Sequence, residues 1–246
     1  MLKELEDYNW FPPLFRRFQA EYIGSIVKWF HIYLPLVPVL RDLLINSKSS
    51  RVQDLCSGSG LPSVCLHHDI QPGFPWILSD KFPPPNYYFK EDLFYLSGSS
   101  DILQLEPVKD TCYTLFNAFH HFTNHEQQHI IHRFISAGSP FLIAEILEPG
   151  ILNLLKIFFT TTVLQLLLAP FVQPFSLLRL FFTWLVPLNL FTVCYDGLVS
   201  VIKSKKLHQY RSLLEGYSNP AYRISINRIS NWKGGLIYLK GHPIYK

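Results

Sequence analysis

Short apolar runs alternate with helical patterns over most of the first 150 residues. Apolar positions at helical spacing fill residues 1–47, where prolines divide them into two or three helices. Strands are expected at 51–55, 76–79, 111–116 and 140–146, with a further short segment, the third strand, that ends at 97–101. Helices are expected at 63–69 and 124–135 between them. Strands that alternate with helices indicate a parallel α/β sheet. The last stretch, 222–241, indicates an antiparallel hairpin that joins the same sheet.

Residues 151–202 break this alternation. Only Lys156, Arg179 and Asp196 are charged there, and uncharged runs of 22 and 16 residues cover 157–178 and 180–195. As helices these runs would be about 33 Å and about 24 Å long, against a hydrocarbon core of about 30 Å. Both ends of the segment join one sheet, so it crosses a membrane an even number of times or enters and turns back. The pattern favours a helical hairpin in the bilayer, and the alternative is a soluble lid or a homodimer surface.

Composition narrows the function classes further. Charged residues are 16% of the 246-residue chain, against about 25% in an average soluble domain, and the net charge is only +4. This apolar chain is not disordered, and it lacks the dense basic stripe of a nucleic-acid-binding protein. The four cysteines show no metal-binding or disulfide spacing, and the start MLKELEDYNW lacks the apolar core of a secretion signal. We therefore expect a reducing location, cytoplasmic or on the cytoplasmic side of a membrane.

Four regions follow from these patterns. Residues 1–47 form an N-terminal helical cap, and 48–150 form the first part of the α/β core. Residues 151–202 form the apolar helical insertion. Residues 203–246 complete the core with the terminal β-hairpin.

The sequence V-Q-D-L-C-S-G-S-G at 52–60 carries the first chemical signal. A strand that ends in an acid and runs into a glycine turn before a helix is typical of the nucleotide-binding corner of a doubly wound sheet. Glycines let the backbone approach a ligand closely. The Gly-Lys-Ser/Thr ending of a phosphate loop and the third glycine of a dinucleotide fingerprint are both missing. Two further acids, Asp80 and Asp101, end the next two short segments.

These motifs resemble those of class I S-adenosylmethionine-dependent methyltransferases. The resemblance implies a doubly wound, Rossmann-like α/β sheet of seven strands, with Asp54 beside the methionine amino group, Asp80 on the ribose hydroxyls and Asp101 at the adenine amino group. Gly58 and Gly60 match two glycines of the family's loop, and Cys56 stands where the family has the first. The implied S-adenosylmethionine site comprises Asp54, Cys56, Ser57, Gly58, Ser59, Gly60, Asp80, Lys81, Asp101, Ile102, Asn117 and Ala118.

The sequence F-N-A-F-H-H-F at 116–122 resembles the family's fourth strand and the loop beneath the transferred methyl group. His120 and His121 are the candidate catalytic residues there, either as a general base or by position alone, because a histidine near its ordinary pKa suits a base. His121, His125 and His129 share a helical spacing, but a carboxylate or thiolate partner is not apparent nearby, so no metal site is expected.

Substrate contacts are expected from Tyr8 and Trp10 in the leading segment. Glu145 ends the fifth strand and either faces the substrate pocket or bonds to nearby backbone. A narrower bacterial group resembles nearly the whole chain, through the loop motif, Asp80–Lys81–Phe82–Pro83, W-F-P at 10–12, Y-D-G-L-V-S at 195–200 and a late apolar insertion.

The resemblance implies an S-adenosylmethionine-dependent methyltransferase. The apolar insertion, for its part, indicates a small apolar or lipid-like acceptor that enters from a membrane. The alternative is a non-catalytic, membrane-associated module that keeps the fold, which the replacement of a glycine by Cys56 favours.

Overall fold

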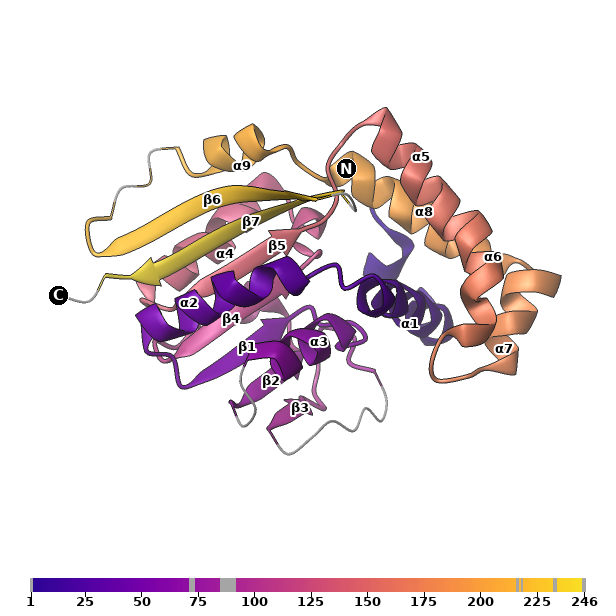
Figure 1. Ribbon diagram of the computed structural model, residues 1–246, viewed down its shortest axis with the longest axis horizontal. Helices are drawn as coiled ribbons and strands as arrows, with labels where there is room; N and C mark the ends of the chain where they lie inside the picture. The colour runs from indigo at the N-terminus through magenta and orange to yellow at the C-terminus, as the bar shows by residue number, and fades with distance from the viewer. Residues whose placement is uncertain are drawn as a thin grey trace.

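The computed structural model describes residues 2–70, 74–84, 92–215, 217, 219–231 and 234–244. Its centre is a seven-stranded sheet of order β3-β2-β1-β4-β5-β7-β6 (Figure 1). Strands β1 to β5 are parallel, while β7 runs antiparallel to both β5 and β6. The strands are β1 (Arg51–Leu55), β2 (Trp76–Ser79), β3 (Leu93–Tyr95), β4 (Thr111–Phe116), β5 (Phe141–Glu145), β6 (Tyr222–Asn231) and β7 (Gly234–Pro243). The predicted seven-stranded α/β sheet is confirmed, and the turn at 232–233 lies outside the described residues.

Helices cover both faces of this sheet. The sheet-covering helices are α2 (Val37–Ser47), α3 (Leu61–Ile70), α4 (Asn124–Ser136) and α9 (Leu207–Leu213). Alternate residues of β4 point to opposite faces, so Cys112 and Phe116 pack with α2 and α3, whereas Tyr113 and Leu115 pack with α4 and α9. Helix α4 begins with a capping box, in which Thr123 and Glu126 bond each other's backbone N–H groups.

The N-terminal region divides between cap and core. The 3₁₀ turn η1 (Leu5–Asp7) and α1 (Pro13–Trp29) lie beside the carboxyl ends of the strands. A second turn, η2 (Leu34–Leu36), leads into α2, whose Leu40 and Leu43 are fully buried in the core. Residues 1–47 are therefore more than a cap, because α2 supplies one of the covering helices of the sheet.

The third predicted strand is misplaced. Strand β3 ends at Tyr95, so Asp101 follows it at a distance instead of ending it. The chain between them stays beside the end of β2, since Leu96 and Ser100 donate backbone hydrogen bonds to Leu78 and Asp80. Asp101 then begins the turn η3 (Ile102–Gln104), and its carboxylate accepts the N–H of Leu103.

The insertion folds as a helical hairpin against α1. Its first arm runs through α5 (Ile151–Phe159), the π turn η5 (Thr160–Leu164), α6 (Gln165–Leu168) and η6 (Ala169–Phe171). Its second arm runs through α7 (Leu177–Leu180), the π turn η7 (Phe181–Leu185) and α8 (Leu188–Lys203). The arms lie side by side (Figure 1). Gly197 makes this possible, because an added Cβ there would come within 2.8 Å of Ile157 Cγ2.

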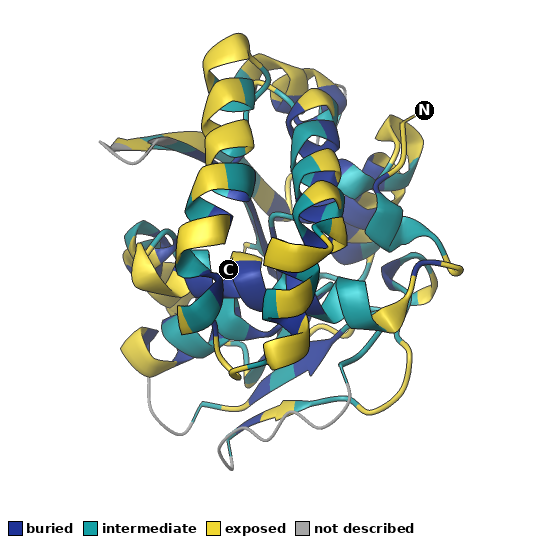
Figure 2. Ribbon diagram, turned by 90° about the vertical axis from the view of Figure 1, so that its right-hand side faces the viewer, coloured by how far each residue is buried: buried dark blue, intermediate teal, exposed yellow. Residues whose placement is uncertain are grey.

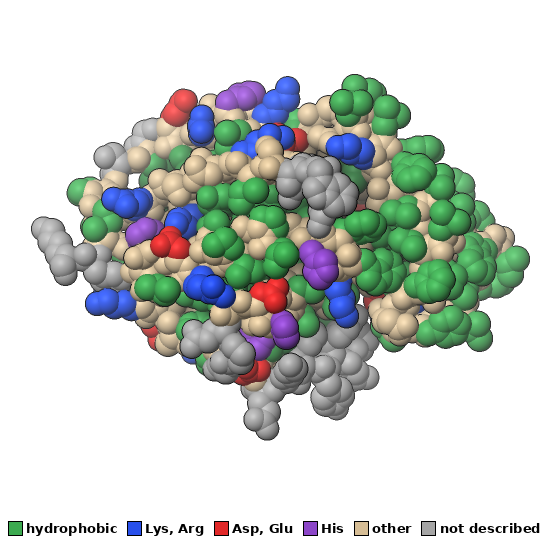
Figure 3. Space-filling view, in the orientation of Figure 1, with side chains coloured by type: hydrophobic (Ala, Val, Ile, Leu, Met, Phe, Trp, Pro, Cys, Tyr) green, Lys and Arg blue, Asp and Glu red, His purple; other side chains and the backbone are tan. Residues whose placement is uncertain are grey.

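The hairpin exposes its apolar side chains and buries its polar ones. Figure 2 shows exposed residues along its outer side, and Figure 3 shows the apolar side chains gathered over it. Leu167, Leu177 and Phe191 are 63%, 73% and 66% exposed, whereas Gln165, Thr183 and Asn189 are buried on the side that faces the rest of the protein. Residues 151–171 form one helix that is long and apolar enough to cross a membrane. Only 11% of its most apolar stretch is buried inside the protein. Soluble proteins rarely leave so large an apolar surface uncovered.

Candidate active site

The glycine loop joins β1 to α3 at the carboxyl edge of the sheet. Gly58 and Gly60 have φ of +51° and +72°, in the left-handed region that glycine adopts freely. Cys56 has φ of +53°, so the cysteine adopts the conformation of the glycine it replaces, and the turn is kept. Among the described residues, an added Cβ on Gly58 would meet only the Ala20 Cβ, at 4.0 Å, so these residues leave the space over the backbone open. This leaves room for a ligand to approach the loop.

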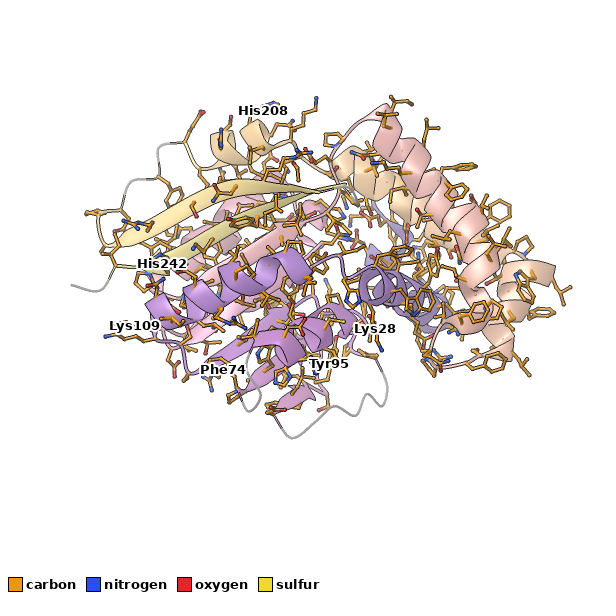
Figure 4. The ribbon with its side chains drawn as sticks, in the orientation of Figure 1. Lys28, Phe74, Tyr95, Lys109, His208 and His242 are labelled. Atoms are coloured by element: carbon orange, nitrogen blue, oxygen red, sulfur yellow. The ribbon has the colours of Figure 1, made fainter. Side chains whose placement is uncertain are left out.

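Hydrogen bonds hold this loop against the next two strands. Ser57 Oγ donates to the Asp54 carbonyl and accepts the N–H of Ser79. Tyr95, labelled in Figure 4, donates its hydroxyl to the Gly58 carbonyl over 3.2 Å. Ser59 Oγ is 3.4 Å from the N–H of Leu61, at the start of α3. The serines Ser57 and Ser59 are thus buried parts of the loop frame.

Asp54 is a buried carboxylate that lacks a cation. It is 2% exposed, and its Oδ1 accepts a 2.7 Å hydrogen bond from Thr114 Oγ1 on β4. Burial raises the pKa of Asp54 to about 6, although hydrogen bonds from neighbouring hydroxyls oppose this rise. Within the described part of the chain no basic side chain pairs with it. A site of this kind suits the amino group of a ligand such as S-adenosylmethionine, whose positive charge would stabilise the ionised carboxylate.

Asp80 and Asp101 lie on the same edge, on the far side of the loop. The two Asp80 oxygens accept the N–H groups of Gly58 and Phe82, at 2.9 Å and 2.8 Å. Asp101 pairs with Lys81 Nζ at 3.1 Å. Each carboxylate oxygen has a second lone pair, so Asp80 can still accept hydroxyl donors. The structure therefore brings the three predicted acids to one edge of the sheet, around an open glycine loop.

The fourth-strand loop lies beside them. Asn117 follows β4 with φ of +50°, and its Oδ1 is 3.4 Å from the N–H of Ile146. Ala118 and Ile102 are buried at 8% and 5% exposure. The 3₁₀ turn η4 (Phe119–His121) then presents the two histidines. Because η4 ends before α4 begins, His121 does not share a helical face with His125 and His129.

His120 and Glu145 form a fully buried pair. Glu145 accepts the N–H of Phe119 and lies 2.7 Å from His120 Nδ1, and both side chains are at most 1% exposed. Of the two alternatives for Glu145, the structure shows the one in which it bonds to nearby backbone. Glu145 is 0% exposed, and this burial against His120 corrects the expectation of a substrate contact.

His121 is surrounded by acids from the N-terminal segment. Its Nδ1 is 2.9 Å from Asp7 Oδ1, and its Nε2 is 3.4 Å from Glu4 Oε2 and 3.7 Å from Glu6 Oε1. Burial would lower the pKa of His121, but these carboxylates outweigh it and raise the pKa to about 9. The imidazole is therefore protonated at neutral pH. In this arrangement neither histidine offers an accessible free base, so positioning becomes the role that the geometry favours.

The acidic residues Glu4, Glu6 and Asp7 around His121 were not predicted from the sequence. Lys203 on α8 lies 3.0 Å from Glu4 Oε1 and 3.6 Å from Asp7 Oδ2, and Glu4 is 1% exposed. Burial raises the pKa of Asp7, but the charges of His121 and Lys203 and their hydrogen bonds lower it by more, so the pKa lies below its ordinary value. The one signal in the sequence was the acidic E-L-E-D start, which is unusual in so apolar a chain.

The expected substrate residues differ in exposure. Trp10 is 67% exposed, and its ring lies 5.4 Å from the half-buried ring of Tyr8. Arg16 donates to the backbone of Glu6 and Tyr8 and stacks over Phe82 at 3.8 Å. Arg16 thus ties the leading segment to the loop that follows Asp80.

Comparisons with known proteins agree with this architecture at low identity. No protein-family profile and no curated protein matches the chain. Human N-acetylserotonin methyltransferase in complex with S-adenosylmethionine is 15% identical and matches 87% of this chain and 53% of its own, with a TM-score of 0.49. The mitomycin 7-O-methyltransferase MmcR is 14% identical, and the match covers 86% of this chain and 54% of MmcR, with a TM-score of 0.46. Synechocystis magnesium protoporphyrin IX methyltransferase with bound S-adenosylhomocysteine is also 14% identical, and the match covers 89% of this chain and 94% of that protein, with a TM-score of 0.46.

The chain spans about half the length of the first two of these proteins. At such scores the likeness adds nothing to what the strand order already shows. The structure has the architecture that the sequence motifs imply. It is a seven-stranded sheet with five parallel strands, an antiparallel β7 and helices on both faces. The chain has the class I methyltransferase fold.

Proposed function

We propose that this protein is an S-adenosylmethionine-dependent methyltransferase for a small apolar or lipid-like acceptor. The observation that carries the proposal is the open glycine loop ringed by Asp54, Asp80 and Asp101 at the carboxyl edge of the sheet. Asp54 would hold the ammonium of the cofactor and Asp80 its ribose hydroxyls. Bound S-adenosylmethionine supplies a methyl group on a sulfonium, which an acceptor can attack directly. The chain then needs only to bind, orient and exclude water.

Cofactor binding is tested by calorimetry. Asp80→Ala should weaken S-adenosylmethionine binding at least tenfold, since a lost charged acceptor costs about 1.5–3 kcal/mol. Gly58→Val should abolish binding, because the side chain would fill the open space over the loop. Asp110→Ala is the matched control: this acid is 61% exposed and contacts Ser50 and Arg51 at the opposite edge of the sheet. Unchanged affinity in Asp80→Ala would remove Asp80 from the site.

Turnover separates the enzyme from the non-catalytic alternative. Incubation with S-adenosylmethionine and a membrane extract should yield S-adenosylhomocysteine and one product heavier by a methyl group. Binding without turnover across polar and apolar extracts would support the module instead.

We further propose that the outer face of the hairpin lies in the cytoplasmic leaflet of a membrane. Its polar residues are buried, with Arg179 and Asp196 bonded to side chains of α1, while many of its apolar residues are exposed, which is the reverse of a soluble helix pair. Near the tip, Arg179 on α7 pairs with Glu21 on α1, and both are buried. The tip is thereby held against the domain, so the hairpin lies along the bilayer surface without crossing it. Lys156 and Lys206, exposed at the ends of the hairpin, suit anionic headgroups.

Sedimentation with liposomes tests this attachment. Leu167→Lys with Leu177→Lys should release the protein, at up to about 3 kcal/mol for each charge placed in the hydrocarbon. Ile45→Lys is the matched control, because Ile45 is 71% exposed on α2, away from the hairpin. If the face is a dimer surface or a soluble lid, wild type should remain in solution without detergent, and light scattering should distinguish dimer from monomer.

A further inference from the structure

Both histidines of η4 direct one ring nitrogen toward the same buried carboxylate. His121 Nε2 lies 3.4 Å from Glu4 Oε2, and His120 Nε2 lies 3.9 Å from Glu4 Oε1. The imidazole rings stand 4.6 Å apart, and one ligand atom from each of the three residues lies within 4.8 Å of the others. Two imidazoles and a carboxylate are a donor set that first-row divalent ions prefer.

The Nδ1 atoms of both histidines lie at hydrogen-bond distance from carboxylates, as is usual for metal-bound histidines. His120 Nδ1 lies 2.7 Å from Glu145, and His121 Nδ1 lies 2.9 Å from Asp7. A carboxylate on Nδ1 fixes the ring orientation and leaves Nε2 as the ligand, which is the usual outer shell of a zinc-bound histidine. Two such pairs that converge on a third carboxylate are more than an exposed ion-pair cluster requires.

One of these nitrogens has no partner of its own. His120 Nε2 makes no hydrogen bond among the described residues, although the side chain is fully buried. A buried polar atom without a partner costs about 1–3 kcal/mol, so such an atom usually serves a ligand. It faces Glu4, whose other contacts come from α8: Lys203 on Oε1 and Ser200 on Oε2.

We propose that His120 Nε2, His121 Nε2 and Glu4 bind a divalent transition-metal ion such as Zn²⁺. Ligand bonds of about 2.0–2.1 Å place tetrahedral donor atoms roughly 3.3 Å apart. The three ligand atoms lie within 4.8 Å of one another, so they need to approach by at most about 1.5 Å. Glu6 Oε1, 3.7 Å from His121 Nε2, is the nearest carboxylate for a fourth position. The ion would pin residues 4–7 onto the loop that follows β4. The proposal is independent of methyl transfer.

Zinc titration of the chelator-treated full chain in detergent micelles tests the site, with a chromophoric chelator as competitor. Wild type should bind one equivalent. Glu4→Gln should weaken binding at least 100-fold, and Asp7→Asn, which touches only the outer nitrogen, 10- to 100-fold. The double variant His125→Asn/His129→Asn is the matched control, since both histidines are exposed on α4, and it should bind as wild type does.

Cobalt gives a second reading that does not depend on folding of the Glu4 variant. Co²⁺ bound to wild type should show the visible absorption of a four- or five-coordinate site, and Asp7→Asn should alter that spectrum. Absence of stoichiometric zinc in wild type would overturn the proposal and leave an ion-pair cluster around Lys203. Zinc binding that persists in Glu4→Gln and Asp7→Asn but vanishes in the α4 double variant would overturn it as well. Neither result bears on S-adenosylmethionine binding.

Discussion

Replacing Asp54 by asparagine should stabilise the ligand-free protein while it destroys the cofactor site. Burial, with a smaller contribution from the charge of Asp80, raises the pKa of Asp54 from its ordinary 3.8 to about 6. Each pKa unit corresponds to about 1.4 kcal/mol, so the difference of 6 − 3.8 corresponds to about 3 kcal/mol. Below pH 3.8 the carboxyl is protonated in both the folded and unfolded states, and it costs nothing. Between pH 3.8 and 6 the unfolded chain ionises first, so the cost grows, and above pH 6 it is fully present.

Urea unfolding of wild type and Asp54→Asn in one detergent, at pH 4 and pH 8, measures this cost. Asparagine keeps an acceptor for Thr114 Oγ1 but adds an amide whose packing affects stability at both pH values. The informative quantity is therefore the change in the stability difference between the two pH values. It should favour the variant at pH 8 by about 2.4 kcal/mol, because about 0.6 kcal/mol of the cost is already present at pH 4, where the unfolded carboxyl is partly ionised.

Two controls make the result decisive. Asp110→Asn, at an exposed acid, should change stability by less than about 0.5 kcal/mol at either pH. Asp54→Asn should also lose at least tenfold in S-adenosylmethionine affinity, because the ammonium loses its counter-charge. A stability difference that is the same at pH 4 and pH 8 would refute the reasoning, since it would show that Asp54 is not held at a raised pKa.

Three further changes probe the loop and the hairpin. Cys56→Gly should raise the free energy of unfolding by about 1 kcal/mol in urea denaturation, because glycine adopts the positive φ at that position without strain. Gly197→Val should lower the thermal midpoint in detergent by overpacking against Ile157, at a cost of about 1–3 kcal/mol. Glu21→Gln should lower the free energy of unfolding by about 3–5 kcal/mol in the same assay, because it leaves Arg179 buried without its counter-charge. The double variant Glu21→Leu/Arg179→Leu should recover much of that loss. No recovery would show that the other hydrogen bonds of Arg179 dominate.

The parts of the fold that local patterns encode were predictable. β4 and β5 are short runs of mainly apolar and β-branched residues, and the capping box Thr123–Glu126 marks the start of α4. The acids at the strand ends were recognisable because parallel strands bring their carboxyl ends to one edge of the sheet. The third strand was misplaced because β3 has only three residues, too few to show a period, and its residues pair only with β2.

The partners of the histidines could not be predicted from local sequence. Asp7 meets His121 across 114 positions and Glu145 meets His120 across 25, and no periodicity encodes such pairs. A histidine at a strand exit suggests a base when its surroundings are unknown. Its protonation depends on which carboxylates the fold brings beside it. The motif alone therefore left a general base and a positioning role open, and the geometry favours positioning.

Helix α8 connects the exposed apolar face to the loop that carries the histidines. Its buried side binds the leading segment at three successive turns: Asp196 accepts the N–H groups of Leu5 and Glu6, Ser200 donates to Glu4, and Lys203 pairs with Glu4. That segment in turn holds His121 through Asp7. Because each of these contacts is direct, α8 cannot move relative to the sheet without breaking them or carrying the segment with it. Asp196, Ser200 and Lys203 are therefore placed where they fix the leading segment beside His121, while the exposed side of the second arm is largely apolar.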